Sequence, residues 1–516
     1  MPTLTGVDPL DPTPSNRREI VFAQGTSSGS NNELPVLLYG NKTSSGSETV
    51  ETISNLPISD SQDCKDRFGA RSEIYQQYRV FTRIDPNAKI FGIAVTEAGT
   101  AASRPFVFAN TATSSGTCFI DWGGETVSFA VNSGDTAGTI GANAVLAINS
   151  AAEGSWPFTA AGTTTVTCTA SNTGPRGDLV IGRIRMRFDK VTSVITTTIT
   201  PGSLTAGATL DDFTTALSVA ANGDYAINVF PCHSTSALTT TDNQAGEAIT
   251  NIATNRNPTN GKSQYGFFGL VGTPTEAVTC VASAGGNSAT AYFFHQENNP
   301  WTPGMLAAHH AAAVRVARLG YPGFNINGYT NSDTTPYDVP RPYASTDEPT
   351  AAEIKTMLNN GVSPVAFSKV GAAYLVRFIS SRSFIPGTST SDYRAREGHI
   401  AFALDYFWES TLTTWLTTKQ PNVSADLPKG AKPLPLTSYP ADLRRIIETK
   451  IDNLAGPNPD GLYPGPILAN DEVAAMKASI VTDGPTYGKL GVTANLVAVK
   501  HLIGSAQKFR EVGPAY

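Results

Sequence analysis

One short pattern in the sequence has the spacing of a hydrolase nucleophile: Gly25-Thr26-Ser27-Ser28-Gly29. A G-x-S-x-G pattern activates its serine only where a strand turns tightly into a helix, so that the hydroxyl is exposed at the turn. Here Asn-Asn-Glu and a strand-like segment follow the pattern in place of a helix. We therefore interpret these residues as a flexible loop and predict no serine nucleophile.

The histidines do not have the spacing of a metal site. His309 and His310 are adjacent within MLAAHHAAAVRVARLG, which is typical of a helix, so their side chains point about 100° apart. A zinc site needs three or four clustered ligands, and no His-Glu-x-x-His occurs. We predict that this pair packs internally or at an interface, and that His295, at a strand end, makes a structural hydrogen bond. The glycines form no G-x-G-x-x-G or Walker pattern, so nucleotide binding is not predicted.

The cysteines lack C-x-x-C spacing, which argues against zinc and thioredoxin chemistry. They are Cys64, Cys118, Cys168, Cys232 and Cys280. Buried free thiols are the first interpretation, because a cytoplasm keeps thiols reduced. An odd number of cysteines cannot pair completely within one chain. Disulfides to another chain are therefore a second interpretation.

Between residues 178 and 233 the predicted secondary structure changes from a half-buried strand to a short helix and then to a fully buried strand. Residues 178–189 alternate three arginines with three apolar side chains, which predicts a half-buried strand. Residues 209–217 predict a short helix. The nearly unbroken apolar run YAINVFP at residues 225–231 predicts a strand buried on both faces, as in a parallel sheet.

Length and composition limit the class of protein. The chain has 516 residues, and single cores stop growing beyond roughly 250–300 residues, so about two to four domains are expected. Charged residues make up 16% of the sequence, the net charge is −6 and no long basic run occurs, so direct nucleic-acid binding is not predicted. The first residues lack the apolar segment of a signal peptide, and no apolar run approaches the roughly 20 residues of a membrane helix.

The composition shifts to Thr, Gly and Ala over residues 112–200. Two strands joined by Gly123-Gly124 predict a hairpin, and TTTVTCTAS at residues 163–171 alternates apolar and threonine side chains. This region is predicted to be an inserted β-sandwich with one helix. Strand-like and helical runs alternate from about residue 205 to 380, which favours helices over a mainly parallel sheet. Residues 438–457 predict a helix that begins at Ser438, ends at Gly456-Pro457 and carries one apolar stripe.

Several segments, in this order, resemble the sheath subunit of contractile phage tails, especially the Mu-like branch. Residues 59–78 are similar to a family helix that ends in Phe-Gly-x-x-Ser, here Phe68, Gly69 and Ser72. Residues 87–95 resemble the strand that follows, and residues 133–151 the helix of the inserted β domain. The segments GGNSATAYFFHQENNPW and LNNGVSPV fall downstream in the family order.

The resemblance implies an α/β core of subtilisin-like topology with an inserted β-sandwich and a helical and extended C-terminal domain. The expected boundaries are an arm at 1–33, core at 34–111, an outward insertion at 112–200, the subtilisin-like sheath domain at 201–380 and the C-terminal domain at 381–516. The chain lacks a His-Gly-Thr segment and a Gly-Thr-Ser that opens a helix with Met-Ala. A scaffold without its catalytic triad, and hence no enzyme, is expected.

For function, the resemblance implies hexameric rings stacked as a helix around an inner tail tube, which contract and drive the tube through a host envelope. The implied partners are other copies of the chain, the tube protein, and baseplate and tail terminator proteins. No cofactor, nucleic-acid contact or membrane insertion is implied. The implied location is the virion tail, assembled in the cytoplasm of a bacterial host. The alternatives are the sheath of a phage-derived bacteriocin or other injection system, or another virion surface protein.

The resemblance also assigns residues to contacts between subunits. The arm strands that would join neighbouring sheets by β-augmentation are Glu19, Ile20, Val21, Phe22 and Ala23, and near the C-terminus Ala506, Lys508 and Phe509. The Ser/Gly tracts at residues 26–32 and 43–47 would act as hinges. Arg444, Arg445 and Lys450 are candidates for contact with the tube. The second interpretation of the five cysteines is that some of them form disulfides between neighbouring subunits.

Overall fold

The structure is a computed structural model, and it describes the chain from residue 34 to residue 496 with gaps. The gaps are residues 98, 208–212, 222, 233–243, 257–262, 322–323, 325, 327–336, 343, 345–346, 369–370, 383–395, 420–438, 463–464, 487–488 and 495. The predicted arm strands at both ends, the G-x-S-x-G loop and Ser438 lie outside the described residues.

A seven-stranded sheet forms the core, in the order β14-β13-β12-β11-β10-β1-β2. Every neighbouring pair is parallel except β13 with β14. The strands are β1 (Val36–Gly40), β2 (Ile90–Ala94), β10 (Ile227–Phe230), β11 (Tyr265–Leu270), β12 (Ala291–His295), β13 (Val362–Phe367) and β14 (Ala373–Leu375). Each residue of β10 is buried, which confirms the strand predicted at residues 225–231.

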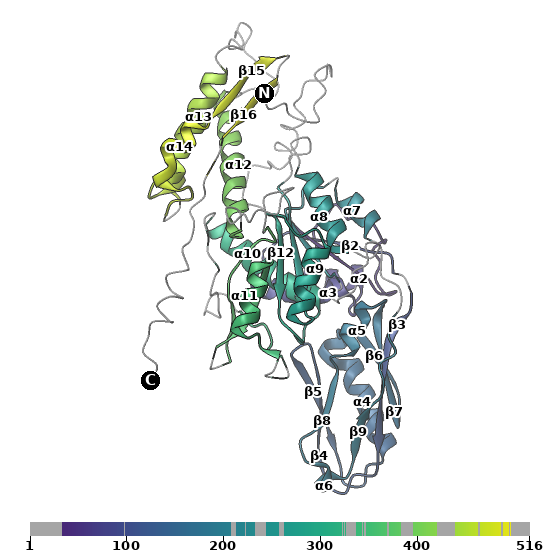
Figure 1. Cartoon of the computed structure of the whole chain (residues 1–516). Helices are drawn as coiled ribbons and strands as arrows, with labels where there is room; N and C mark the ends of the chain where they lie inside the picture. Colours follow the sequence, from purple (N-terminus) through teal and green to yellow (C-terminus); the bar gives the residue numbers. More distant parts are fainter. Residues whose placement is uncertain are drawn as a thin grey trace, which may run out of the picture.

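Helices cover both faces of this sheet, as a parallel sheet requires. On one face, α3 (Glu73–Ile84) packs against α10 (Pro303–Gly320). The other face is covered by α7 (Thr214–Ala220), α8 (Gln244–Asn255), α9 (Pro274–Ser283) and α11 (Ala351–Asn359) (Figure 1). The helix predicted at the two histidines is α10. A doubly covered α/β core is therefore present, with its helices in two layers.

The segment predicted to be a single family-like helix at residues 59–78 forms two helices, α2 (Ser61–Phe68) and α3. Gly69 ends α2 with φ +91, where a side chain would collide with Thr43. Ser72 then caps α3 by accepting a hydrogen bond from the Tyr75 N–H. The tract at residues 43–47 lies against this corner, because the Thr43 N–H donates to the Phe68 carbonyl at 2.9 Å. The hinge predicted there is a packed turn in this structure.

Two further sheets form the inserted domain. Their orders are β6-β7-β3-β9 and β5-β4-β8, and α4 (Ala137–Ser150) packs against both. The strands are β3 (Ala101–Ala109), β4 (Gly116–Trp122), β5 (Glu125–Val131), β6 (Phe158–Gly162), β7 (Thr165–Thr173), β8 (Arg185–Phe188) and β9 (Thr198–Pro201), with the short α6 (Thr192–Ile195) before β9. The region contains two sheets and the predicted hairpin, whose two glycines have positive φ, but it contains more helices than the single one predicted.

The insertion begins earlier than residue 112, because β3 pairs with β7 and β9 instead of continuing the core sheet. We therefore define the insertion as residues 101–201. The single strand predicted at residues 178–189 is also wrong in part. Its first residues form α5 (Arg176–Ile181), which packs on β3 and β7, and only Arg185–Phe188 pair with β4 as β8.

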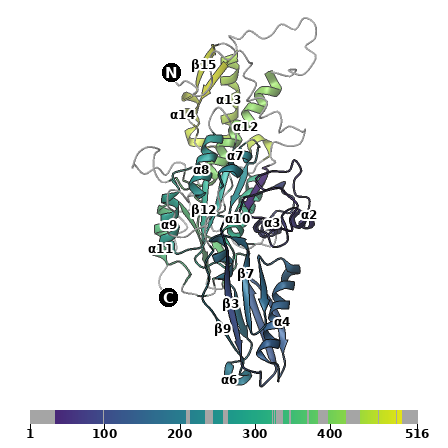
Figure 2. The same ribbon diagram turned by 90° about the vertical axis from the view of Figure 1, so that its right-hand side faces the viewer.

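The C-terminal unit, which we define as residues 399–496, begins with the long helix α12 (His399–Lys419). It continues through α13 (Tyr439–Ala455), α14 (Val473–Ala478) and the hairpin of β15 (Val481–Thr486) and β16 (Lys489–Thr493). The predicted stripe of α13 is buried at Ile447, Ile451 and Leu454 in a separate hydrophobic cluster. This unit lies at one end of the molecule and the insertion at the other, with the core between them (Figure 2). Of the helices that the structure describes, none is both long and apolar enough to cross a membrane.

Candidate functional site

The carboxyl end of the core sheet is where a ligand crevice would be expected. The chain passes from β1 to β2 on one side and from β10 to β11 on the other, so β1 and β10 flank a topological switch point. In open α/β sheets, ligands bind outside the carboxyl ends of the strands at such a point. The residues that follow β1 and β10 are Asn41 and the segment containing Cys232.

The chain itself fills this position. Arg176, the first residue of α5 in the insertion, is 4% exposed and its guanidinium donates to Glu73 Oε2 at 2.7 Å and to Asn41 Oδ1. Glu73 Oε2 also accepts from the Asn41 N–H at 3.2 Å. The same guanidinium lies over the ring of Phe213, 5.4 Å from its centre. A buried charge pair therefore occupies the switch point and ties the insertion to the core.

A second group of polar contacts also links the core to the insertion. We call all of these contacts together, including those of Arg176, the insertion joint. Arg71 donates to three backbone carbonyls of the insertion, those of Trp156 at 3.0 Å, Asn149 at 2.9 Å and Phe158. In the opposite direction, Arg183 of the insertion donates to the Asn299 carbonyl of the core. Because the acceptors are fixed backbone carbonyls, these contacts set both position and orientation.

Aromatic donors complete the insertion joint beside a small pocket. The Trp301 indole donates to the Gly123 carbonyl at 2.9 Å, within the turn of the β4–β5 hairpin. The Trp156 indole donates to Glu125 at 2.9 Å, and Glu125 also pairs with Arg79. The pocket is lined by polar groups that are already paired in this way, together with the two rings of Trp122 and Trp301. These contacts hold structure in place and present no nucleophile.

The histidines have structural positions in the core. His295 ends β12, and its Nε2 lies 2.8 Å from the Gly272 carbonyl, which confirms the predicted hydrogen bond. His310 bridges the Leu306 carbonyl and the Tyr337 hydroxyl, each at 2.8 Å. His309 is fully buried beside Trp301. Burial lowers the pKa of His295 and His310 to about 4 and lowers that of His309 well below its usual value, so all three are neutral near pH 7.

The five cysteines are free thiols, and all five are buried in the core or the insertion. Cys168 lies on the inner side of β7, and Cys280 lies on one face of α9 with Ala277 and Ala284, as the sequence predicts. Burial raises the pKa of Cys118, Cys168 and Cys280 to about 12 and also raises those of Cys64 and Cys232 well above the usual value of a thiol. A disulfide between subunits would require one of these buried thiols to become exposed, so that interpretation stays a prediction.

The candidates for tube contact differ in exposure along α13. Arg444 and Arg445 are exposed, and Arg444 pairs with Glu448 one helical turn away at 2.8 Å. Lys450 is buried, and its Nζ lies 2.6 Å from Asp460 Oδ1. Lys450 therefore faces the interior of the C-terminal unit, which removes it as a contact residue in this structure.

Sequence reasoning missed the carboxylate that holds Lys450. Asp460 has a positive φ of 54 and accepts from Lys450, from Asn453 Nδ2 at 2.8 Å and from the Tyr406 hydroxyl at 2.7 Å. These donors come from α12 and α13, so one side chain joins both helices. The Asp-Gly dipeptide at residues 460–461 signals a turn, but its partners are distant in sequence.

A third set of residues, which we call the C-terminal joint, links the core to the C-terminal unit. The Tyr321 hydroxyl, just after α10, donates to the Pro466 carbonyl. The Arg318 guanidinium lies over the Tyr406 ring, 5.1 Å from its centre. The first turns of α12 also contribute, because Ala401 and Phe402 pack in the hydrophobic cluster of the core. Ala403 and Phe407 of the same helix pack in the cluster of the C-terminal unit. Within the described part of the chain, no group of three or more His, Cys, Asp or Glu residues could hold a metal ion.

Comparison with solved structures gives several matches, two of which are described here. The sheath tail protein of Desulfitobacterium hafniense is 11% identical, covers 92% of this chain and 99% of its own, and has a TM-score of 0.42. The baseplate of the anti-feeding prophage contains a chain that is 12% identical, with 58% of this chain and 74% of that chain covered and a TM-score of 0.34. No family model matches the chain. No curated protein matches it either.

Proposed function

We propose that this chain is the structural subunit of a contractile tail sheath. The observation that carries the proposal is the order of its parts: an α/β core interrupted after β2 by a two-sheet insertion, then resumed, then followed by a helical unit. This is the order that the sequence resemblance implies. A β-sandwich inside a parallel sheet, with a separate helical end, is a specific arrangement, whereas the fold of each part alone is not.

The filled switch point supports a mechanical role over a catalytic one. An α/β enzyme keeps the carboxyl edge of its sheet open for a ligand. Here Arg176, Glu73 and Asn41 close that edge with a buried charge pair. The same contact makes the core and the insertion one rigid piece, which is what a subunit that transmits force requires.

In the proposed assembly, subunits form hexameric rings stacked as a helix around an inner tube, and contraction drives the tube through a host envelope. The terminal arms add strands to sheets of neighbouring copies. The C-terminal unit contacts the tube through exposed groups of α13 such as Arg444 and Arg445. The tube, baseplate and tail terminator proteins are the partners, the virion tail is the location, and no catalysis or cofactor is involved.

Electron microscopy of the purified full-length protein tests the proposal. The protein should polymerise into ribbed tubes. Deletion of residues 1–24 should leave a monomer with an unchanged circular dichroism spectrum that no longer forms tubes. The matched control is Leu146→Ala, which alters a residue on α4 that is 68% exposed, and this variant should still form tubes.

One outcome would contradict the sheath function, and another would contradict only the role of the N-terminal arm. A full-length protein that stays monomeric under every condition tried would not be a sheath subunit. Tubes formed by the truncated protein would leave the sheath function standing but would refute the role of the N-terminal arm.

A further inference from the structure

The outer faces of the two sheets of the insertion differ in charge. On the sheet β5-β4-β8, Asp121 pairs with Arg187 at 3.2 Å, and the same guanidinium lies 4.6 Å from the centre of the Phe119 ring. On the sheet β6-β7-β3-β9 the structure describes every outward position, and each holds Thr, Ser, Ala, Val or Pro. We call these outward positions the threonine face. A sheet face that only meets water usually carries charged side chains, so the threonine face indicates a contact surface.

Threonines of β7 form the centre of the threonine face. Thr165, Thr167 and Thr169 alternate with buried residues along the strand. The register places Val107 and Pro105 of β3 beside the first two of them. These side chains are all short, so the face is flat and presents methyl groups beside hydroxyls. Removing such groups from water costs less than removing charges, and the cores of protein interfaces are depleted in charged residues.

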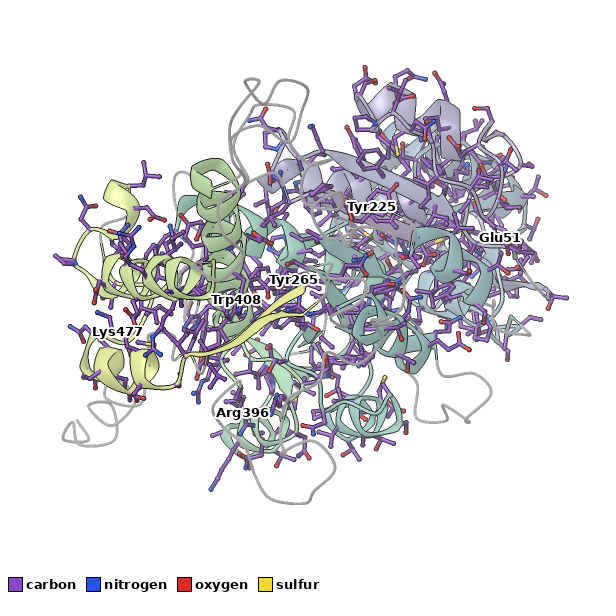
Figure 3. All side chains as sticks on the ribbon, turned by 90° about the horizontal axis from the view of Figure 1, so that it is seen from above. Glu51, Tyr225, Tyr265, Arg396, Trp408 and Lys477 are labelled. Atoms are coloured by element: carbon purple, nitrogen blue, oxygen red, sulfur yellow. The ribbon has the colours of Figure 1, made fainter. Side chains whose placement is uncertain are left out.

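The helices next to this sheet pack on its inner side. Gly177 of α5 lies against the buried Ala170, and Gly141 of α4 lies against the buried Val166. The C-terminal unit, of which Figure 3 labels Trp408, lies at the opposite end of the molecule (Figure 2). The described part of the chain therefore leaves the threonine face uncovered.

The edges of the same sheet are closed to strand addition. The Asn149 side chain donates to the Ala160 carbonyl at 2.9 Å and accepts from the Ala160 N–H at 3.0 Å, so it occupies the edge of β6. The edge strand on the other side, β9, ends at Pro201, which has no N–H to donate. A partner that covers this sheet therefore has to pack on its face.

The opposite flank of the insertion is uncharged as well. None of the 14 residues of α4 is charged. The outer side of this helix carries one stripe at spacings of three and four residues, Thr139, Asn143, Leu146 and Ser150, in which the Leu146 side chain is 68% exposed. Because α4 packs on the inner side of the sheet, this stripe points away from the threonine face. Figure 2 shows α4 along one flank of the insertion and β3 and β9 along the other.

We propose that the exposed stripe of α4 in one copy of the chain packs on the threonine face of a second copy. The partner is the chain itself because each copy has a net charge of −6, and these two uncharged surfaces are where two copies can meet without bringing like charges together. The lengths also agree. The 14 residues of α4 span about 21 Å, and the nine residues of β7 span about 30 Å.

The contact joins two different surfaces on opposite flanks, so it is head-to-tail and continues from copy to copy. In a sheath it would link neighbouring insertions around a ring, and that setting rests on the proposed function. One helix on one sheet buries less than the roughly 1,200–2,000 Å² of a stable interface, so a single contact is weak and repeated contacts add up. The terminal arms remain the main link between subunits. Leu146→Ala therefore weakens the contact without preventing tube formation.

The test uses the full-length double variant Leu146→Cys with Thr167→Cys and a short bis-maleimide that spans the roughly 10 Å between packed elements. All five native cysteines are buried, so wild type gives the background. Each copy carries both thiols, so a head-to-tail contact should give a ladder of dimers, trimers and longer products on a denaturing gel. Either single variant should give no more product than wild type.

A charge placed in the contact gives a matched pair of further variants. Thr165→Glu, added to the double variant, puts a carboxylate without a partner into the contact and should lower the yield of the ladder at least about tenfold. Ser128→Glu changes an equally exposed residue on the outer face of the other sheet and should leave the yield unchanged.

Three results would overturn the contact. They are the absence of a ladder from the double variant, equal loss of the ladder for Thr165→Glu and Ser128→Glu, and dimers from Thr167→Cys alone, which would show that two like faces meet. Electron microscopy of the same samples reports tube formation separately. Tubes without a ladder would leave the sheath function standing, whereas a ladder without tubes would support the contact and count against the sheath function.

Discussion

The two joints of this molecule are built from different chemistry. At the insertion joint, guanidinium and indole groups donate to backbone carbonyls and to buried Glu73. At the C-terminal joint, a single helix crosses between two hydrophobic clusters, and its carboxylates face two arginines. Fixed carbonyl acceptors allow one orientation, whereas side chains on both sides can repack. The insertion is therefore held to the core in one orientation, whereas the C-terminal unit is held through side chains that can change their packing.

The largest expected effect comes from breaking the charge pair at the switch point. Arg176→Met keeps much of the side-chain volume but leaves Glu73 buried without its cation, which costs about 3–5 kcal/mol. Urea unfolding followed by circular dichroism should show this loss. The double variant Arg176→Met with Glu73→Gln should recover a large part of it, because no uncompensated charge remains. A single variant as stable as wild type would show that the pair contributes nothing to the insertion joint.

A smaller effect is expected at the C-terminal joint. Arg256→Met removes the fork that holds Asp405, and the cost should be about 2–3 kcal/mol, since this carboxylate is only partly buried and keeps the Tyr265 hydroxyl. Hydrogen exchange should show the loss at residues 399–411, with the amides of β4 and β5 unchanged. Equal loss of protection in both regions would mean that the two joints are one cooperative unit.

Sequence patterns predicted the elements of this fold better than the joints between them. The buried run of β10, the β4–β5 hairpin and the stripe of α13 are visible because their periodicity involves residues two to four positions apart. Arg176 looks like an ordinary cation in the sequence, and its partner Glu73 is 103 residues away. The start of the insertion was placed too late for the same reason. The sequence predicts that β3 is a strand, but it does not show that β3 pairs with β7 and not with the core sheet.

The sites were predicted unevenly, and burial explains the difference. The polar side of a helix does not reveal which cation is exposed, so Lys450 was grouped with Arg444 although it binds Asp460 inside the C-terminal unit. The cysteines were first interpreted as buried thiols because a cytoplasm keeps thiols reduced, and all five are buried free thiols in the structure. Contacts made by the chain ends are intermolecular in the proposed function, so one chain contains no signal for their partners.

The smallest expected effect is at the insertion joint. Trp301→Phe removes one indole donor and leaves the Gly123 carbonyl without its partner, which should cost about 1–2 kcal/mol. Neither group titrates between pH 6 and pH 8, so this loss should be the same at both values. Urea midpoints of the variant, measured against wild type at each pH, check this. A loss that changes with pH would mean that the insertion joint contains a titrating group.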